Sequence, residues 1–360
     1  MRRLEVKSSA GDYQVVVGRG AWRSIKRLKG YSSVLVLTEP ALWERWGEKL
    51  TAESGLSSLR LITVPTGERS KSLAMAGRVA SDLVAAGADR RSLLIAFGGG
   101  VVGDLGGFVA STYMRGIHYV QAPTTVLAQV DSAIGGKTAV NVGANKNLVG
   151  TFYAPRLVVS DAEVLSSLPL RALQSGLYEA LKHAILADAK LFAWMEGKLA
   201  KLRPDDTALL ENLVARAAAI KVDVVTRDER EASLRRVLNL GHTYGHALEE
   251  ATGYRRFLHG EAVAWGILMV TRLAEIVQVL DPAVGKRIAQ AVKAVGPLPS
   301  LRGIREERVL GLLPRDKKAV GGRIHWVLPQ HIGSVIVTPD VSPPAVFQAF
   351  DEVQNGEWNG

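Results

Sequence analysis

The alternation of two kinds of segment in the first half of the chain constrains its fold more than any other feature. Short, largely apolar runs at residues 34–37, 92–97 and 157–159 alternate with segments of helical spacing, such as the Ala- and Leu-rich stretch at 72–86. Strands that alternate with helices in this way indicate a parallel sheet whose connections are crossover helices. The sequence therefore predicts an α/β domain at the start of the chain.

The second half of the chain has a different composition. From about Pro169 onward Leu, Ala, Glu, Lys and Arg recur at helical spacing, and only residues 323–328 and 334–337 read as strands. A Ser-Ser-Leu-Pro segment that ends at Pro169 separates the two halves, and 360 residues are enough for two cores. We therefore predict an α/β domain at 1–168 and a mainly helical domain at 169–360, with the active site in the cleft between them.

Composition and charge limit the chemistry. The chain has no cysteine, which excludes disulfides and thiolate metal sites and leaves His, Asp and Glu as metal ligands. The net charge is +10, but the basic residues are spread along helical segments among Asp and Glu. This pattern favours a small anionic substrate over nucleic acid. Neither a signal peptide nor an apolar run of spanning length is evident, so we expect a cytoplasmic protein with no membrane partner.

A glycine-rich turn follows one of the predicted strands. Residues 98–103, Gly-Gly-Gly-Val-Val-Gly, come directly after the run that ends at Phe97 and precede a segment that can open a helix. Such glycines let the backbone approach a pyrophosphate at a helix N-terminus, although a turn that only packs a helix on a strand remains the alternative. The acidic ribose ligand expected about 20 residues later is missing, and Glu39 is the better candidate. The segment 66–71 and the pair Thr124 and Thr125 add polar groups at strand ends.

The segment 135–138, Gly-Gly-Lys-Thr, resembles part of a P-loop. The first glycine of that motif would fall on Asp131, so a nucleoside triphosphatase is disfavoured. Lys137, with Lys146 and Asn147 close behind it, still makes a candidate site for a phosphate or a carboxylate. A solvated turn is the alternative.

Histidines and one glutamate form a candidate metal site. His242 and His246 are four residues apart, hence on one face of a helix, and His259 follows thirteen residues later. Such a pair can hold zinc, but it also arises by chance in core or surface helices. Glu179 lies on a predicted amphipathic helix that places Lys182 on nearly the same face. Two histidines and one carboxylate would leave coordination positions open, as in a catalytic zinc site.

Seven motifs in order carry a resemblance to a known family. They are residues 98–107, 123–125, 135–138, 146–148, 179–182, 238–246 and 259–263. Together they resemble the 3-dehydroquinate synthase family of the sugar phosphate cyclase superfamily, over about residues 39–318. The resemblance implies a Rossmann-like NAD-binding domain of α/β class with a parallel sheet, followed by a mainly helical domain that binds metal and substrate.

The resemblance also implies roles for individual residues. The metal ligands would be Glu179, His242 and His259, which makes His246 a substrate or acid-base residue. The expected NAD contacts are Glu39, Thr66, Gly67, Glu68, Lys71, Gly99, Gly100, Val101, Val102, Gly103, Asp104, Thr124, Thr125, Lys137, Lys146, Val164, Leu165, Ser166 and Ser167. The expected substrate contacts are Arg115, Asp131, Lys137, Asn147, Lys182, Lys221, Arg235, Asn239, His246 and Lys317 or its neighbour Lys318.

Three positions depart from the usual sequence motifs of the family. Glu39 stands where Asp is common, Ala139 stands where Gly is common, and residues 231–235 lack the usual Gly after Glu. Glu39 keeps a carboxylate, and the other two changes affect only local backbone geometry. None of them removes a functional group.

The activity implied by the resemblance is the conversion of 3-deoxy-D-arabino-heptulosonate 7-phosphate to 3-dehydroquinate and phosphate. It would use NAD transiently, with zinc or cobalt, in the shikimate pathway, and the protein would be a homodimer. One alternative is a sugar phosphate cyclase with valiolone- or inosose-type products. The others are an NAD-linked polyol dehydrogenase and a basic nucleic-acid-binding protein. Arg235 and the lysines at 317 and 318 favour a substrate with a carboxylate.

Overall fold

The computed structural model describes the chain except for residues 57, 144, 314–323 and 359–360. The chain forms two compact units. The first consists of Met1–Leu168 and Pro204–Arg230, and the second of Pro169–Arg203 and Glu231–Gly360. The fold class predicted from the sequence, a parallel α/β sheet followed by a mainly helical region, is confirmed.

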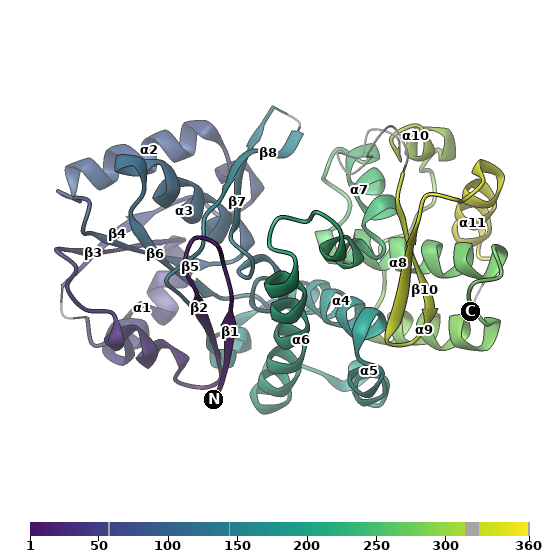
Figure 1. The fold of residues 1–360 in the computed structure, drawn as a ribbon, viewed down its shortest axis with the longest axis horizontal. Helices are drawn as coiled ribbons and strands as arrows, with labels where there is room; N and C mark the ends of the chain where they lie inside the picture. Colours follow the sequence, from purple (N-terminus) through teal and green to yellow (C-terminus); the bar gives the residue numbers. More distant parts are fainter. Residues whose placement is uncertain (57, 144, 314–323, 359–360) are drawn as a thin grey trace. The chain divides into compact units, whose positions relative to one another are not determined.

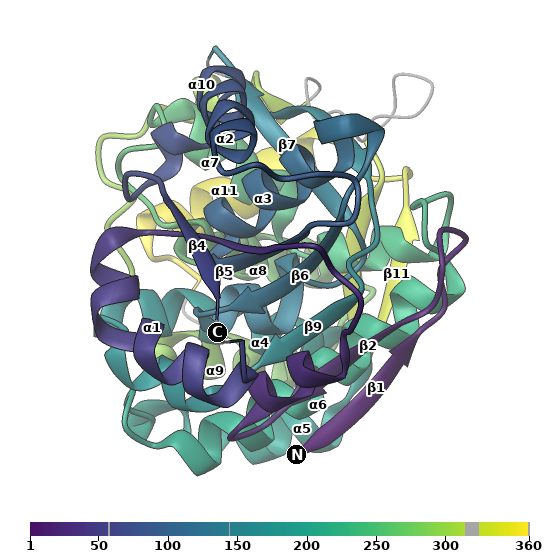
Figure 2. The ribbon, with the colours of Figure 1, turned by 90° about the vertical axis from the view of Figure 1, so that its left-hand side faces the viewer.

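The first unit is built on a sheet of seven strands in the order β1-β2-β9-β6-β5-β3-β4, within the part of the chain that the structure describes. β1 and β2 are antiparallel, and the other neighbouring strands are parallel (Figure 2). β5 is buried at each of its positions, as its continuous apolar run predicts for a strand covered on both faces. The strands are β1 (Arg2–Val6), β2 (Tyr13–Val17), β3 (Val34–Thr38), β4 (Leu59–Thr63), β5 (Leu93–Gly98), β6 (His118–Pro123) and β9 (Leu157–Ser160).

The order of the strands reverses between β3 and β5. β3 leads to β4 at the edge of the sheet, and the chain then crosses back over β3 to form β5 and β6. Because crossovers are right-handed, α1 (Pro40–Ser54) covers one face, and α2 (Leu73–Ala85) and α3 (Gly100–Thr112) cover the other (Figure 1). Open α/β sheets bind ligands at the carboxyl ends of strands at such a reversal.

A hairpin that the sequence analysis did not predict follows the sheet strand β6. β7 (Lys137–Val142) and β8 (Asn145–Phe152) pair antiparallel as a separate two-stranded sheet. Gly150 allows this pairing, because a Cβ atom there would lie 2.2 Å from the carbonyl oxygen of Thr138. Lys137, Lys146 and Asn147 therefore lie on strands and not on a plain surface turn.

The second unit surrounds helix α8, most of whose residues are buried. α8 packs against α4, α7, α9, α11 and β10. The predicted strands at 323–328 and 334–337 correspond to β10 and β11, with residue 323 outside the described residues. The elements are α4 (Leu170–Ala187), α5 (Ala189–Glu196), α7 (His242–Ala251), α8 (His259–Ile276), α9 (Pro282–Val295), α10 (Glu306–Leu310), β10 (Trp326–His331), β11 (Ser334–Thr338) and α11 (Pro343–Asn355).

Helix α6 (Thr207–Arg227) corrects the predicted domain division. The segment Pro204–Arg230 was assigned to the second domain, at 169–360, but it groups with the first unit, where α6 packs on β1, β2 and the short helices at 128–132 and 162–167. It buries Leu210, Leu213 and Val214 there. Its composition matches the second half of the chain, and composition does not reveal against which unit an amphipathic helix packs.

The helices were also compared with the length and hydropathy that a membrane crossing requires. None of the helices among the described residues meets both conditions.

Candidate metal and cofactor sites

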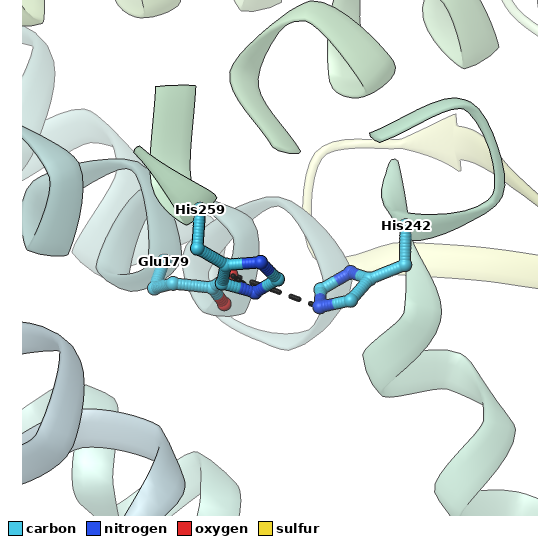
Figure 3. Close-up of side chains that lie close together, drawn as sticks. All are labelled: Glu179, His242 and His259. Carbon is cyan, nitrogen blue, oxygen red and sulfur yellow. Dashed lines mark ion pairs between the residues drawn. The ribbon is translucent and has the colours of Figure 1, made fainter. Parts of the chain in front are cut away.

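Three side chains of the second unit converge on one point. Glu179 is fully buried in the middle of α4, His242 is the first residue of α7, and His259 is the first residue of α8. The Oε1 atom of Glu179 lies 3.7 Å from Nε2 of His242 and 3.5 Å from Nε2 of His259 (Figure 3). All three ligand atoms lie within 4.8 Å of one another. Two imidazoles and one carboxylate at this separation fit a divalent metal ion that keeps open coordination positions.

Glycines bring the three helices close enough to form this group. A Cβ atom on Gly260 would lie 1.9 Å from the carbonyl oxygen of Ser175 in α4, and one on Gly266 would lie 1.8 Å from the carbonyl oxygen of Gly241. Gly241 itself, directly before α7, has a φ of 76°. The backbone of α8 therefore touches α4 on one side and the start of α7 on the other. This close approach places His259 beside both Glu179 and His242.

An ion pair fixes the start of α8. The carboxylate of Glu261 accepts a hydrogen bond of 2.7 Å from the backbone N–H of Leu258, which caps the helix. The same carboxylate accepts two bonds, of 2.6 and 2.8 Å, from the guanidinium of Arg171 on α4. His259 directly follows Leu258, so the bonds of Glu261 to Leu258 and to Arg171 also hold this metal-ligand candidate in place.

The other ring nitrogen of each histidine has its own partner. Nδ1 of His242 lies 3.2 Å from the carbonyl oxygen of Leu240, and Nδ1 of His259 lies 3.1 Å from the Oε2 atom of Glu249. Both arrangements direct Nε2 toward Glu179. The sequence analysis missed Glu249, although its place seven residues after His242 and three after His246, on one face of α7, was a usable signal. His246, Glu249 and His259 form a second group with metal-ligand spacing.

The carboxylates around His259 change its protonation. Burial lowers the pKa of His259, but the negative charges of Glu249 and Glu179 outweigh burial and raise this pKa to about 10. In the absence of a metal ion the ring is therefore a cation held between two carboxylates.

The predicted substrate residues of the second unit lie on three elements. Lys182 pairs with Glu179 through a distance of 2.6 Å between Nζ and Oε2, and both side chains are buried, which confirms that they share one face of α4. The ring of His246 stacks on that of His259 with centroids 6.0 Å apart. Arg235 is buried in the short helix at 234–239, which packs against α4, and Asn239 in the same helix donates a 2.9 Å bond to Glu231. Lys317 and Lys318 lie outside the described residues.

The predicted NAD contacts of the first unit gather at the carboxyl ends of its parallel strands. Glu39 directly follows β3, Thr66 to Lys71 follow β4, Thr124 and Thr125 follow β6, and Val164 to Ser167 follow β9. Gly99, Gly100, Val101, Val102, Gly103 and Asp104 form the turn after β5 and the first residues of α3. Lys137 and Lys146 belong to the β7–β8 hairpin instead.

The glycine-rich turn brings α3 close to the sheet. A Cβ atom on Gly103 would lie 2.7 Å from the side-chain oxygen of Gln121, and one on Gly98 would lie 2.5 Å from the Cβ atom of Val102. The turn therefore packs α3 tightly against the sheet, while Gly99, Gly100 and Val101 at the start of the helix remain partly accessible. The packing alternative and the pyrophosphate hypothesis are therefore compatible.

Charged groups beside the turn are mostly paired. Lys71 forms an ion pair with Asp104, and burial raises the pKa of Asp104 although Lys71 opposes the rise. Burial likewise raises the pKa of Glu39, and a hydrogen bond with Thr66 opposes it. The side chains of Val164 and Leu165 are fully buried, so only their backbone groups are available to a cofactor.

The predicted substrate residues of the first unit lie on short helices, on the β7–β8 hairpin and on α6. Arg115 and Asn147 have positive φ values of 67° and 53°, which ordinary residues seldom adopt. The N–H of Asn147 donates a 2.9 Å bond to the side-chain oxygen of Asn141. Lys221 on α6 forms an ion pair with Asp131, and both residues belong to the first unit.

Comparisons with known proteins cover nearly the whole chain. Residues 61–175 match the family described as 3-dehydroquinate synthase N-terminal, and residues 176–319 match the one described as 3-dehydroquinate synthase C-terminal. The chain is 44% identical over 363 residues to the 3-dehydroquinate synthase of Koribacter versatilis, and the match covers 98% of each protein.

Solved structures of similar fold carry NAD and a metal ion. The 2-epi-5-epi-valiolone synthase of Streptomyces hygroscopicus subsp. jinggangensis, with NAD+ and Zn2+ bound, is 27% identical with a TM-score of 0.88, covering 99% of this chain and 100% of that one. A 2-deoxy-scyllo-inosose synthase complexed with carbaglucose-6-phosphate, NAD+ and Co2+ is 23% identical with a TM-score of 0.84, covering 98% and 99%. The second likeness concerns the fold alone.

Proposed function

Because this chain belongs to the 3-dehydroquinate synthase family, we propose that it converts 3-deoxy-D-arabino-heptulosonate 7-phosphate to 3-dehydroquinate and phosphate with NAD and one divalent metal ion. The observation that carries the proposal is the convergence of Glu179, His242 and His259 on one buried point. The identity of 44% to a 3-dehydroquinate synthase, against 27% to a valiolone-type cyclase, favours the sugar acid as substrate.

Two bound groups would supply the chemistry that side chains lack. When bound, NAD takes up and returns a hydride, and a divalent metal polarises the oxygen at the carbon that is oxidised. Glu179, His242 and His259 would hold the metal, and zinc and cobalt both suit this donor set. The glycine-rich turn at 98–103 would receive the pyrophosphate at the N-terminus of α3, and Glu39 would accept hydrogen bonds from a ribose.

The chain's cationic residues would bind the two acidic ends of the substrate. Lys137, Asn147 and Arg115 are proposed for the phosphate, and Arg235 with Lys317 or Lys318 for the carboxylate. Arg235 is buried, so it loses little side-chain entropy when it binds an anion.

Proton transfer is assigned to groups beside the metal-ligand candidates. His246, whose ring stacks on that of His259, and Lys182, which pairs with Glu179, would order or move protons during oxidation and elimination. The pair of Lys221 and Asp131 and the amide of Asn239 complete the proposed set of substrate contacts. The pathway served would be the shikimate pathway, and a cytoplasmic homodimer remains a prediction from the family resemblance.

The test is phosphate release from the heptulosonate phosphate with zinc and NAD present. Release that a chelator abolishes and zinc restores, without net NADH, is the expected result, because the hydride returns to the substrate. Net NADH from polyols would instead indicate a dehydrogenase. Release from sedoheptulose 7-phosphate, and not from the acid, would contradict the proposed substrate and move the protein to the neighbouring cyclases.

A further inference from the structure

Glu249 is a buried carboxylate beside the metal-ligand candidates that the mechanism above does not use. It lies in the last turns of α7 with 3% of its surface exposed. Its Oε2 atom is 3.1 Å from Nδ1 of His259, and Nε2 of the same ring is 3.5 Å from the Oε1 atom of Glu179. The imidazole of His259 therefore has a carboxylate at each of its two nitrogens.

The two carboxylates differ in what else surrounds them. Glu179 also faces His242 Nε2 at 3.7 Å, so it belongs to the group of two histidines and one carboxylate. Glu249 approaches the far side of the His259 ring, and its own helix carries His242 seven residues earlier. A carboxylate that accepts the N–H of a ligand histidine fixes the ring and increases the basicity of its other nitrogen.

We propose that Glu249 is a positioning residue, which accepts the Nδ1–H of His259 and holds Nε2 of that ring toward Glu179 and the metal ion. The inference rests on the proposed function only in requiring that a metal binds to Glu179, His242 and His259. Burial makes the arrangement effective, since a carboxylate removed from water gains more from a hydrogen bond with the Nδ1–H of His259 than an exposed one would.

His242 shows a neutral counterpart of the same device. Its Nδ1 atom lies 3.2 Å from the backbone carbonyl oxygen of Leu240, so its Nε2 is directed by a neutral acceptor. The ring of His259 is the more exposed of the two, with 32% of its side chain accessible against 9% for His242. A ring with fewer neighbours needs a stronger partner to keep one orientation, and a charged acceptor supplies it.

The competing role for Glu249 is that of a direct ligand, because His246, Glu249 and His259 also have metal-ligand spacing. The two roles predict different losses of affinity. Loss of a partner of a ligand histidine typically costs about 10–100-fold in metal affinity. Loss of a ligand costs far more, and it also changes the number of donor atoms around the metal.

The experiment measures zinc affinity by competition with a chromophoric chelator, and the visible spectrum of the cobalt-loaded protein, for Glu249→Gln and Glu249→Ala. We expect zinc affinity to fall about 10–100-fold in Glu249→Ala. The fall should be smaller in Glu249→Gln, because the amide oxygen still accepts the Nδ1–H of His259. The cobalt spectrum should keep the band positions of the wild-type protein, because the donor atoms around the metal do not change. Glu250→Gln is the matched control, since Glu250 is the exposed neighbour on the same helix and should leave both readouts unchanged.

Two results would overturn the inference. Unchanged zinc affinity in both variants, with only a lower melting temperature of the metal-free protein, would make Glu249 a packing residue. A loss as large as that of His259→Ala, with altered cobalt bands, would make it a direct ligand. Both readouts need only the metal ion and no substrate. If the enzyme failed to act on the heptulosonate phosphate, the proposed function would be refuted, but the conclusion about Glu249 and metal binding would still stand.

Discussion

At the scale of single residues, the metal-ligand candidates illustrate what local pattern can and cannot predict. The four-residue spacing of His242 and His246 correctly indicates a common helix face, and their ring centroids lie 5.3 Å apart. The residues alone nevertheless left a zinc pair of these two histidines open. The residues alone also offered Glu179 as a third ligand, but only the family resemblance replaced His246 by His259 in the ligand set. Periodicity cannot make that choice, because His259 meets His242 and Glu179 through the packing of three helices.

The protonation of His259 leads to a prediction about pH. The carboxylates of Glu249 and Glu179 raise the pKa of this ring to about 10 against the effect of burial, so the metal-free ring is charged at pH 7. A metal ion must then displace that proton. We expect zinc binding to release about one proton from this site and the apparent affinity to rise about tenfold per pH unit from pH 7 to pH 9. Calorimetry in two buffers of different ionisation enthalpy measures the proton release.

The sign of this effect follows from the direction of the shift. The raised pKa means that the competing proton is lost only as the pH approaches 10, so zinc affinity increases throughout the range below that value. An affinity that does not change from pH 7 to pH 9, with no proton released, would show that the pKa of His259 is not raised in the metal-free protein.

Replacement of Glu179 by Gln tests the carboxylate of the metal group. The change removes one candidate ligand and the charge that pairs with Lys182 over 2.6 Å. We expect a loss of phosphate release of about 10²–10³-fold, since metal polarisation is worth several kcal/mol in the transition state. Steady-state phosphate release and zinc content by mass spectrometry measure the two effects. Full zinc occupancy together with full activity would show that the metal lies elsewhere, and Glu250→Gln again serves as the control.

At the scale of helices and strands, tertiary packing decided what the sequence left open. The strands β3, β5 and β9 were predictable because their apolar runs are buried along almost their whole length. The edge strands β1 and β4 were not predicted, because each of them is largely exposed. The β7–β8 hairpin was not predictable, because much of its sequence is polar or glycine and only Thr138 and Val140 are buried among the residues of β7. The close contact of α4, α7 and α8 was equally hidden, since a helix glycine gives no sign of what lies against it.

The contact of Gly260 with α4 predicts the effect of adding one methyl group. In Gly260→Ala the Cβ atom would lie 1.9 Å from the carbonyl oxygen of Ser175, so the start of α8 must move away from α4 and take His259 with it. We expect a loss of about 1–3 kcal/mol in the free energy of unfolding, as in other overpacked sites, together with weaker zinc binding. Chemical denaturation of the metal-free variant and chelator competition measure the two quantities.

Gly197→Ala is the matched control for this change. Gly197 ends α5 in the same unit, with an ordinary φ of −77° and no atom within 4 Å of the added Cβ. We expect its stability to change by less than about 1 kcal/mol and its zinc affinity to stay at the wild-type value. Equal zinc affinity in Gly260→Ala and Gly197→Ala would show that the helix contact does not position His259.

At the scale of the whole molecule, the two units divide the proposed ligands between them. The metal-ligand candidates all lie in the second unit, and the predicted NAD contacts all lie in the first. The predicted boundary at residues 168 and 169 coincides with one of the junctions between the units. The return of Pro204–Arg230 to the first unit was not predictable, since the apolar face of an amphipathic helix fits many surfaces.

This division predicts how each ligand changes backbone protection. A ligand at about 100 times its Kd stabilises the unit that binds it by about 2.7 kcal/mol. Amide hydrogens that exchange only when this unit opens then exchange about 100-fold more slowly. We expect NAD alone to slow exchange in Met1–Leu168 and in α6, and zinc alone to slow it in α4, α7 and α8. Hydrogen exchange followed by mass spectrometry resolves these segments.

Helix α6 is the decisive segment in that experiment. It lies in the second half of the sequence but packs on β1 and β2, so it should respond to NAD as the sheet does. Protection of α6 by zinc and not by NAD would contradict the division of the chain that the contacts define.

The route of the chain through the units also bears on how the protein is made. It leaves the first unit after Leu168, returns at Pro204 and leaves again after Arg230. Because synthesis proceeds from the N-terminus, α4 and α5 emerge from the ribosome before α6 does. A nascent chain that ends at Leu168 still exposes the apolar surface that Leu210, Leu213 and Val214 later cover. The first unit can therefore close its core only after Arg230, and not already after Leu168, has emerged from the ribosome.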